Sequence, residues 1–390
     1  MHKNTYFYGL YSQNKNMTAK EDALFSHYII DGVRMDMSPA ELLEECTEDY
    51  NYDFPDSSTF DDIIDESTEP PLSSFSYDKE KENDYLAMTT AATHEERPFR
   101  MLYPEYFTRL QIAKALLSRL WSKGHFKLGN LRLWAQWEWN CEKTGNMSAF
   151  YRSVESASNY IYGLGVQLED YIFIEEDRNN AKFFAWLEEE DALFKSSPYE
   201  SRHAWIEEVR ACSQVITADP KSWLIYIPFD TCGFRLGASL LTEVAGHDGG
   251  KAPDISDPDY FIDCYEVVRE LVEDGIVISG TVVADGGLIT ALNNIRGENG
   301  LDIDIKGIMS SYQEDSRARI LFGEIPGVII QVSDENYDYV DSQLLLQDIA
   351  YYPIGHPSMA ENDIKISEIG KNGVIDILVS LLDHASEGED

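Results

Sequence analysis

The sequence lacks the features that mark secreted, membrane-spanning or zinc-binding proteins. Its five cysteines are scattered over 390 residues and form no Cys-x-x-Cys pair, so neither a disulfide framework nor a zinc site is indicated. No apolar run approaches the ~18 residues of a membrane span, and the first residues lead into no apolar signal segment. We therefore expect free thiols, no membrane association and a cytoplasmic location.

Basic residues are also scarce. The chain has 31 Lys and Arg against 70 Asp and Glu, which gives a net charge of −39. Such a chain repels nucleic acid and anionic membrane surfaces, so neither is an expected partner. An anionic ligand would require a local cluster of Lys, Arg or backbone N–H groups.

The negative charge is concentrated near the N-terminus. Residues 44–84 contain fifteen Asp and Glu against two Lys, a third of the net charge of the chain. Charge repulsion and a poor supply of core residues favour an acidic linker or exposed loop. The aromatic residues within it could instead dock on a partner or on the rest of the chain. The sequence thus predicts an N-terminal extension over residues 1–84.

Helix and strand patterns alternate from Pro98 onward. Aromatic residues make up 12% of the chain and apolar residues 43%, which is enough for a substantial core. The clearest helix start is Asp257-Pro258-Asp259, with Asp as N-cap and Pro in the first turn. The spacing of apolar residues predicts helices over 104–121, 147–164, 257–275, 287–295 and 337–346. It predicts strands over 131–139, 166–175, 223–228, 276–283, 300–305, 327–332 and 350–354. Residues 176–200 read as a charged loop.

Two glycine-bearing turns are the candidate ligand site. They are Gly233-Phe-Arg-Leu-Gly-Ala-Ser239 and Ala284-Asp-Gly-Gly-Leu288. Glycines allow backbone N–H groups to approach an anion, although the same residues could simply make tight turns. The candidate nucleotide-binding residues are Arg235, Gly237, Ser239, Asp285, Gly286 and Gly287. Arg235 could equally form an ion pair, and Asp285 could cap a helix.

The rest of the chain offers no alternative catalytic site. Glu324 is interpreted as a turn residue. No Ser-His-Asp or Cys-His set has a supporting motif, so no catalytic residue and no metal ligand is assigned.

The order of these segments resembles the second half of the large phosphoribosylformylglycinamidine synthases, in the aminoimidazole-ribonucleotide-synthetase superfamily. Residues 233–239 resemble the RLGGS turn of that family, and 285–288 resemble the end of its HDxSDGGL motif. Leu321-Phe-Gly-Glu-Ile-Pro-Gly-Val-Ile-Ile-Gln331 follows in the same order. Upstream, Arg97-Pro98 lies where the family has ERTP. The resemblance covers residues 85–360 and is firmest from residue 210.

The resemblance implies a two-domain α/β (α+β) fold. An N-terminal α/β domain would span residues 85–228, and a C-terminal α+β domain residues 229–390, after the acidic extension 1–84. ATP would lie between the domains. The family pairs two N-terminal domains across a barrel, which implies a homodimer or a synthase-like partner chain. No glutaminase domain is expected, because residue 390 ends the sequence.

The chain departs from the family at positions that the resemblance assigns to nucleotide or metal. Val166–Ile174 lacks the Gly-Lys-Asp of the GKDSxSM motif. Lys114 stands where the EALTN helix has a magnesium-binding carboxylate, and a cation cannot be a ligand of Mg²⁺. Thr281-Val282 replaces His-Asp, and Ala238 replaces a glycine.

These departures favour a non-catalytic relative, a pseudoenzyme that binds or scaffolds. One alternative is the auxiliary subunit of a split synthase that acts with a catalytic chain. The other is a nucleotide sensor that binds ATP or ADP without magnesium. The family activity would be that of an ATP-dependent, amidine-forming ligase.

Overall fold

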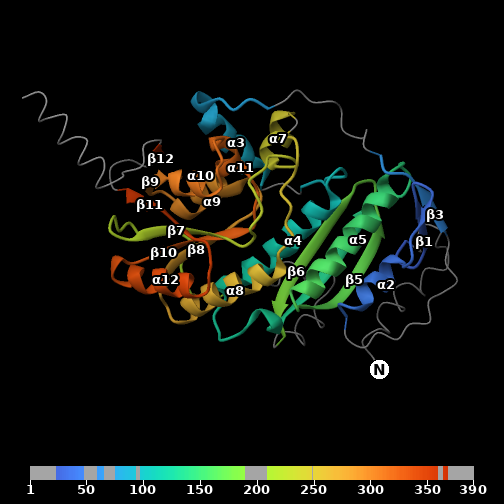
Figure 1. Cartoon of the computed structure of the whole chain (residues 1–390), viewed down its shortest axis with the longest axis horizontal. Helices are drawn as coiled ribbons and strands as arrows, with labels where there is room; N and C mark the ends of the chain where they lie inside the picture. The colour runs from blue at the N-terminus through green and yellow to red at the C-terminus, as the bar shows by residue number, and fades with distance from the viewer. Residues whose placement is uncertain are drawn as a thin grey trace, which may run out of the picture.

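A six-stranded sheet forms the centre of the C-terminal half (Figure 1). The computed structural model describes residues 23–47, 59–65, 75–93, 97–188, 209–247, 249–358 and 363–367. The strands in spatial order are β12 (Ile364–Ser367), β9 (Gly300–Asp304), β11 (Tyr352–Ser358), β7 (Trp223–Pro228), β10 (Gly327–Val332) and β8 (Val277–Val283). All neighbours are antiparallel except β12 and β9. The predicted domain boundary after residue 228 would separate β7 from the other strands of this sheet. We therefore propose that the boundary between the two domains lies before Trp223.

Both faces of this sheet are buried under helices. In β10, Val328 and Ile330 point into the core shared with α8 (Pro258–Glu273), whereas Ile329 points into a second core with α9 (Gly287–Arg296). The alternation follows from the period of two in a strand. In Figure 1, α9, α10 (Lys306–Ser311) and α11 (Arg317–Phe322) lie above the sheet, and α8 and α12 (Asp334–Leu346) lie below it.

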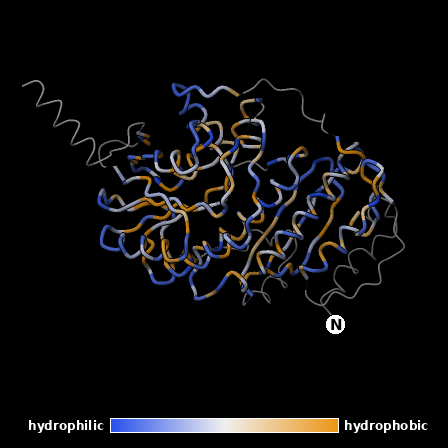
Figure 2. The backbone as a smooth tube through the Cα atoms, viewed as in Figure 1, coloured by the Kyte–Doolittle hydropathy of each residue, from blue (hydrophilic) through white to orange (hydrophobic). Residues whose placement is uncertain are grey.

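A three-stranded sheet lies in the N-terminal half, in the order β5 (Gln167–Glu175), β4 (Leu131–Trp139), β6 (Asn180–Leu187). It packs against α4 (Pro104–Ser118) and α5 (Asn146–Gly163). Trp137 and Trp139 point into the main core, and Trp134 contacts Trp186 on the opposite face. The strand predicted over residues 131–139 is therefore confirmed. The apolar strands and helix faces run through the interior of both halves (Figure 2).

The acidic N-terminal region is partly built into the fold. Strand β1 (His27–Ile30) pairs with β2 (Val33–Arg34) and with β3 (Thr59–Asp62), and α2 (Pro39–Glu44) packs on α5. Tyr28 on β1 is fully buried against Phe150 and Tyr151 of α5. The predicted linker or loop over 44–84 therefore contains a paired strand at 59–62. Its residues 48–58 and 66–74 lie outside the described residues, as does the early aromatic segment around residues 6–11.

Asp62 explains why β3 is held in place. Its carboxylate accepts hydrogen bonds from the backbone N–H groups of Gly145 (2.8 Å) and Ser148 (3.0 Å) at the start of α5. The helix has no capping side chain of its own at Gly145. A residue of the acidic segment thus satisfies N–H groups that a helix otherwise leaves without partners.

The remaining elements are short. They are η2 (Lys79–Lys81), α3 (Glu82–Ala92), η3 (Arg119–Trp121), η4 (Leu128–Asn130) and α7 (Leu240–Ala245). None of the helices in the described part of the chain is long and apolar enough to cross a membrane. None of the five cysteines, which all lie in the described ranges, forms a disulfide.

Most predicted elements are present, with one clear error. The Asp257 cap is confirmed, because its side chain accepts from the Tyr260 N–H at 3.0 Å. Residues 180–187, interpreted as a loop, form β6. Both faces of β6 are buried, because Phe183 points into the main core and Trp186 packs against Trp134 on the opposite face. The sequence of this strand therefore shows no alternation of apolar and polar residues.

Candidate functional site

Arg97, just before α4, is the centre of a buried charge cluster between the two halves. Its guanidinium donates to a carboxylate oxygen of Asp285 at 2.6 Å and of Glu324 at 2.9 Å, and also to the Ala238 carbonyl. The Nε atom lies 3.7 Å from Glu243 on α7. Only 8% of the Arg97 side chain is exposed. One cation therefore connects the N-terminal half to four segments of the C-terminal half.

Glu324 is fully buried and joins the two glycine-bearing turns. One of its oxygens accepts from the backbone N–H of Leu240 (2.7 Å), after the first turn, and of Gly286 (2.8 Å), in the second. The other oxygen faces Arg97 and the Tyr106 hydroxyl at 3.3 Å. The interpretation of Glu324 as a simple turn residue is wrong, since its carboxylate fixes the geometry of both turns.

Asp285 is held by cations of the same chain. Lys114 on α4 contacts one carboxylate oxygen, Arg97 contacts the other, and the Gln111 amide lies 3.4 Å from the latter. Positions 111 and 114 are three residues apart, so they share one face of α4. Asp285 does not cap α9, because the N-cap is Gly286 and no side chain caps it.

The two central carboxylates have opposite pKa shifts. Burial alone would raise the pKa of Asp285, but the Lys114 ammonium and the Arg97 guanidinium outweigh burial and hold that pKa well below its usual value. Burial raises the pKa of Glu324, against the effect of Arg97 and with a further contribution from the Asp285 charge. On acidification, Glu324 therefore takes up a proton before Asp285 does.

Two more charges complete the cluster. Arg100 lies 3.4 Å from Glu243, which also faces Arg97. Three cations (Arg97, Arg100, Lys114) thus meet three carboxylates (Glu243, Asp285, Glu324) within a chain of net charge −39. Mutual neutralisation is what allows charges to remain in a buried site.

The glycines of the second turn have steric and conformational roles. Gly286 and Gly287 have φ values of +79° and +71°, which favour glycine. A Cβ on Gly287 would lie 2.7 Å from the Leu321 carbonyl oxygen. In the first turn Ala238, which the resemblance matches to a glycine, has a φ of +60°. The chain keeps the glycine-like backbone there without the glycine.

The structure separates the other candidate residues. Gly237 donates its N–H to the Lys251 carbonyl at 3.0 Å, and Ser239 caps α7 by accepting from the Thr242 N–H. Arg235 does not join the Asp285 cluster; its guanidinium lies 3.9 Å from Glu314 and lines a different cavity. The alternative interpretation of Arg235 as an ion-pairing residue agrees with this contact.

A cavity of about 350 Å³ adjoins the Asp285 cluster. One face of α4 (Gln111, Lys114, Ser118) and strand β6 form its walls. Lys182 of β6 also lines the cavity, but its ammonium forms an ion pair with Glu138 at 2.7 Å. No group of three or more His, Cys, Asp or Glu side chains within the described ranges is placed to hold a metal ion.

The central residue of the cluster could not be identified by periodicity. Arg97 lies in a short irregular segment, and its partner Glu324 is 227 positions away. The one available signal was Arg97-Pro98, which matches the ERTP of the resembled family in position.

Comparison with known proteins agrees with the resemblance. No family model matches the chain. The chain is 24% identical over 287 residues to the probable chloroplastic/mitochondrial phosphoribosylformylglycinamidine synthase of Arabidopsis thaliana, covering 72% of this chain and 19% of that protein. It is 24% identical over 247 residues to the Homo sapiens phosphoribosylformylglycinamidine synthase, covering 61% and 17%. The chain is thus similar in sequence to part of the phosphoribosylformylglycinamidine synthases.

The fold agrees with this relationship. PurL of T. maritima, solved in complex with FGAR, matches 69% of the chain and 42% of its own length, with a TM-score of 0.52 at 10% identity. The chain thus has the aminoimidazole-ribonucleotide-synthetase-like α/β (α+β) fold that the resemblance implied. It spans about a fifth of the length of the curated synthases that it matches.

Proposed function

We propose that the chain is a non-catalytic member of the synthase family that acts as a binding or scaffolding protein. The observation that carries this proposal is the state of Asp285. Both of its carboxylate oxygens are engaged by cations of the same chain, Lys114 and Arg97. The ammonium of Lys114 stands where the resemblance leads us to expect a carboxylate that binds magnesium.

The chemistry of ATP-dependent ligation supports this conclusion. Such reactions need Mg²⁺ to neutralise phosphate charge and positioned cations to stabilise the transition state. Mg²⁺ requires oxygen ligands in near-octahedral geometry. The Lys114 ammonium repels the ion and also occupies the Asp285 carboxylate that would bind it. Glu324 offers no substitute, because both of its oxygens accept hydrogen bonds within the protein.

The test is turnover by the purified chain with formylglycinamide ribonucleotide, Mg²⁺-ATP and ammonia. We expect release of ADP and phosphate to equal that of an Asp285→Asn variant, which carries no carboxylate at this position. Product formation that is lost in the Asp285→Asn variant would overturn the proposal.

A second function is an auxiliary subunit of a split synthase. The observation in its favour is that 72% of this chain matches the Arabidopsis synthase, although residues 166–174 lack the Gly-Lys-Asp motif. This function predicts a stable complex with a chain that carries the Gly-Lys-Asp motif and a catalytic His. It also predicts that the synthase reaction occurs only when the two chains are mixed. Sedimentation that shows a homodimer of this chain, and no binding to such a partner, would contradict this function.

A third function is binding of ATP or ADP without magnesium. The cavity of about 350 Å³ beside Asp285 favours it, because Lys114 lines the cavity and its side chain is 48% exposed, so its ammonium could neutralise phosphate without a metal. Thermal unfolding in the presence of EDTA tests this function. We expect ATP or ADP to raise Tm, and a Lys114→Met variant to lose that shift. An unchanged Tm would remove this function.

A further inference from the structure

A second cavity of about 900 Å³ lies apart from the Asp285 cluster and shares no lining residue with the first. It is formed by the segment before α3, the first glycine-bearing turn, the loop after α7 and the segment that leads into α11. Its lining includes three aromatic rings and two arginines, namely Phe75, Tyr77, Tyr312, Arg235 and Arg319. The proposed function assigns no role to this cavity.

Ion pairs and ring packing hold the walls in position. Glu82 of α3 binds Arg317 of α11 at 2.9 Å, and 16% and 13% of their side chains are exposed. The Tyr77 hydroxyl donates to the same Glu82. Tyr312, also in the lining, packs edge-on against Phe234 with ring centroids 4.9 Å apart. A ligand would therefore enter a preformed cavity and would pay little to order it.

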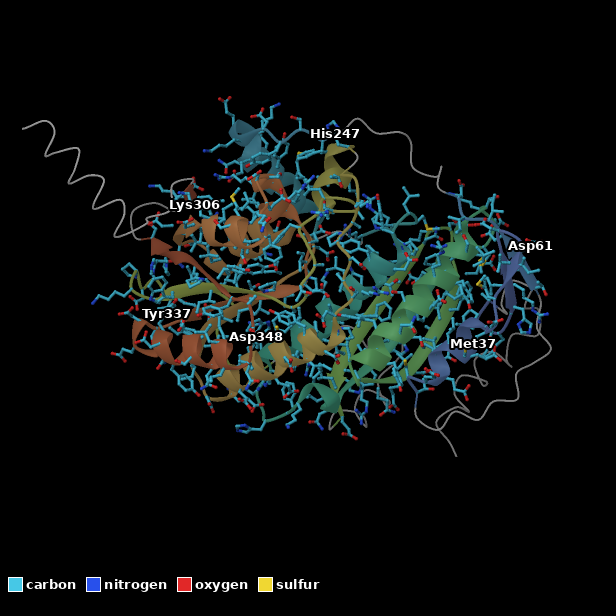
Figure 3. The ribbon with its side chains drawn as sticks, viewed as in Figure 1. Met37, Asp61, His247, Lys306, Tyr337 and Asp348 are labelled. Carbon is cyan, nitrogen blue, oxygen red and sulfur yellow. The ribbon has the colours of Figure 1, made fainter. Side chains whose placement is uncertain are left out.

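Phe75 lines the cavity and packs against two further rings. Its ring lies 5.8 Å from that of Tyr85 on α3 and 5.9 Å from that of His247, which is labelled at the end of α7 in Figure 3. These two rings pack against Phe75 and hold its ring in position. Aromatic walls favour flat rings, which they can contact face to face or edge to face.

The charged side of the cavity is a triad. Glu314 lies 3.2 Å from Arg319 and 3.9 Å from Arg235, and its carboxylate also accepts from the Ser316 N–H. One carboxylate between two guanidiniums leaves the triad with a charge of +1, while Asp315 lies exposed among the lining residues. Each arginine side chain is 44% exposed.

The arginines retain donors for an anion. A guanidinium has five N–H groups in a planar fork that matches carboxylate or phosphate. Glu314 and the carbonyl of Phe234 occupy only part of that capacity in Arg235. A cationic triad beside three aromatic rings is a specific feature in a chain of net charge −39. The volume lies in the range of sites for small organic ligands.

We propose that this cavity binds a small planar aromatic compound that carries one anionic group, with the ring between Phe75, Tyr77 and Tyr312 and the anion on Arg235 and Arg319. The proposal does not depend on the proposed function, because it concerns residues outside the Asp285 cluster.

Isothermal titration in EDTA tests it with five probes: AMP, adenosine, ribose 5-phosphate, 4-hydroxybenzoate and inorganic phosphate. We expect one site for AMP or for 4-hydroxybenzoate, which separates a nucleotide from an aromatic carboxylate, and weaker binding of probes that lack either the ring or the anion. Arg319→Gln should lower the affinity for the anionic aromatic probe about tenfold, because one charge-assisted hydrogen bond is lost. It should change the affinity for adenosine by less than about twofold.

Phe75→Leu keeps an apolar side chain but removes the ring, so it should weaken adenosine and the anionic aromatic probe alike. Arg34→Gln, at an exposed position on β2, is the matched control and should bind like the unaltered chain. Each variant is compared only if its Tm without ligand equals that of the unaltered chain. If Arg319→Gln unfolds early, Arg235→Gln takes its place.

Three results would overturn the proposal. The first is no saturable binding of AMP or of 4-hydroxybenzoate. The second is equal affinity for ribose 5-phosphate, inorganic phosphate and AMP, which would show that the rings make no contribution. The third is binding that Asp285→Asn abolishes and Arg319→Gln leaves unchanged, which would place the ligand in the other cavity.

Discussion

At the scale of single residues, Arg97 has the largest role in the site. It is the only one of the three clustered cations that contacts all three carboxylates. A buried ion pair is a weak source of stability in itself, because desolvation offsets the attraction. Removing one partner is costly, however, because the other charges then remain buried without compensation.

Arg97→Met should therefore destabilise the protein by about 3–5 kcal/mol. The double variant Arg97→Met/Glu324→Gln should recover part of this loss, because it removes one uncompensated carboxylate. Arg152→Met is the matched control; its ion pair with Glu105 is 40% and 41% exposed, and it should cost less than about 1 kcal/mol. Urea unfolding measures all three free energies. Equal losses for Arg97→Met and Arg152→Met would contradict the role of the cluster.

Asp285 gives the site a defined pH dependence. Its pKa is lowered in the folded state, so its ion pairs contribute stability above the ordinary Asp pKa of about 3.9, and this contribution is lost as pH falls through the lower folded-state pKa. Asp285→Asn should lose about 2 kcal/mol at pH 5 and progressively less below about pH 4. Because the pKa of Glu324 is raised, Glu324 takes up a proton before Asp285 does as pH falls. Urea unfolding at a series of pH values tests this, and a difference that stays constant down to pH 2 would be inconsistent with it.

At the scale of elements, the acidic segment stabilises the fold through contacts between β3 and the start of α5. Asp62 accepts two N–H groups at the start of α5 from more than 80 positions away. Asp62→Ala should cost about 1 kcal/mol, the typical value for loss of an N-terminal cap. The neighbouring Asp61→Ala, labelled at the edge of the fold in Figure 3, is exposed and should change stability by less than about 0.5 kcal/mol. Thermal or urea unfolding of both variants distinguishes them, and equal effects would show that charge alone matters.

The elements also show what sequence patterns can predict. Helix α8 is predictable because Asp257 and Pro258 mark its start and one face is apolar. Strand β6 is not, because both of its faces are buried and Phe183, Phe184 and Trp186 show no alternation with polar residues. Strand β3 is hidden among fifteen acidic residues. It is stabilised by contacts with residues distant in the sequence, namely its pairing with β1 and the hydrogen bonds between Asp62 and the start of α5.

At the scale of the whole molecule, the resemblance predicts the fold better than the site. The order of turns and strands from residue 210 onward was sufficient to identify the synthase relationship. The site was predicted as one group of six residues, but the structure places Arg235 in another cavity. It also adds Arg97 and Glu324, whose pairing depends on how the two halves meet. Contacts across 227 positions leave no periodic signal in a single sequence.

The central claim is that cations of the chain itself, and not a metal ion, neutralise Asp285. Electron paramagnetic resonance of Mn²⁺ as a substitute for Mg²⁺ tests it most directly, in a titration of the unaltered chain against Asp285→Asn. The acidic surface will bind Mn²⁺ in both proteins, so the difference between them is the relevant quantity. We predict the same number of Mn²⁺ ions and the same affinities in both. One additional, tightly bound Mn²⁺ in the unaltered chain that is absent from Asp285→Asn would contradict the claim.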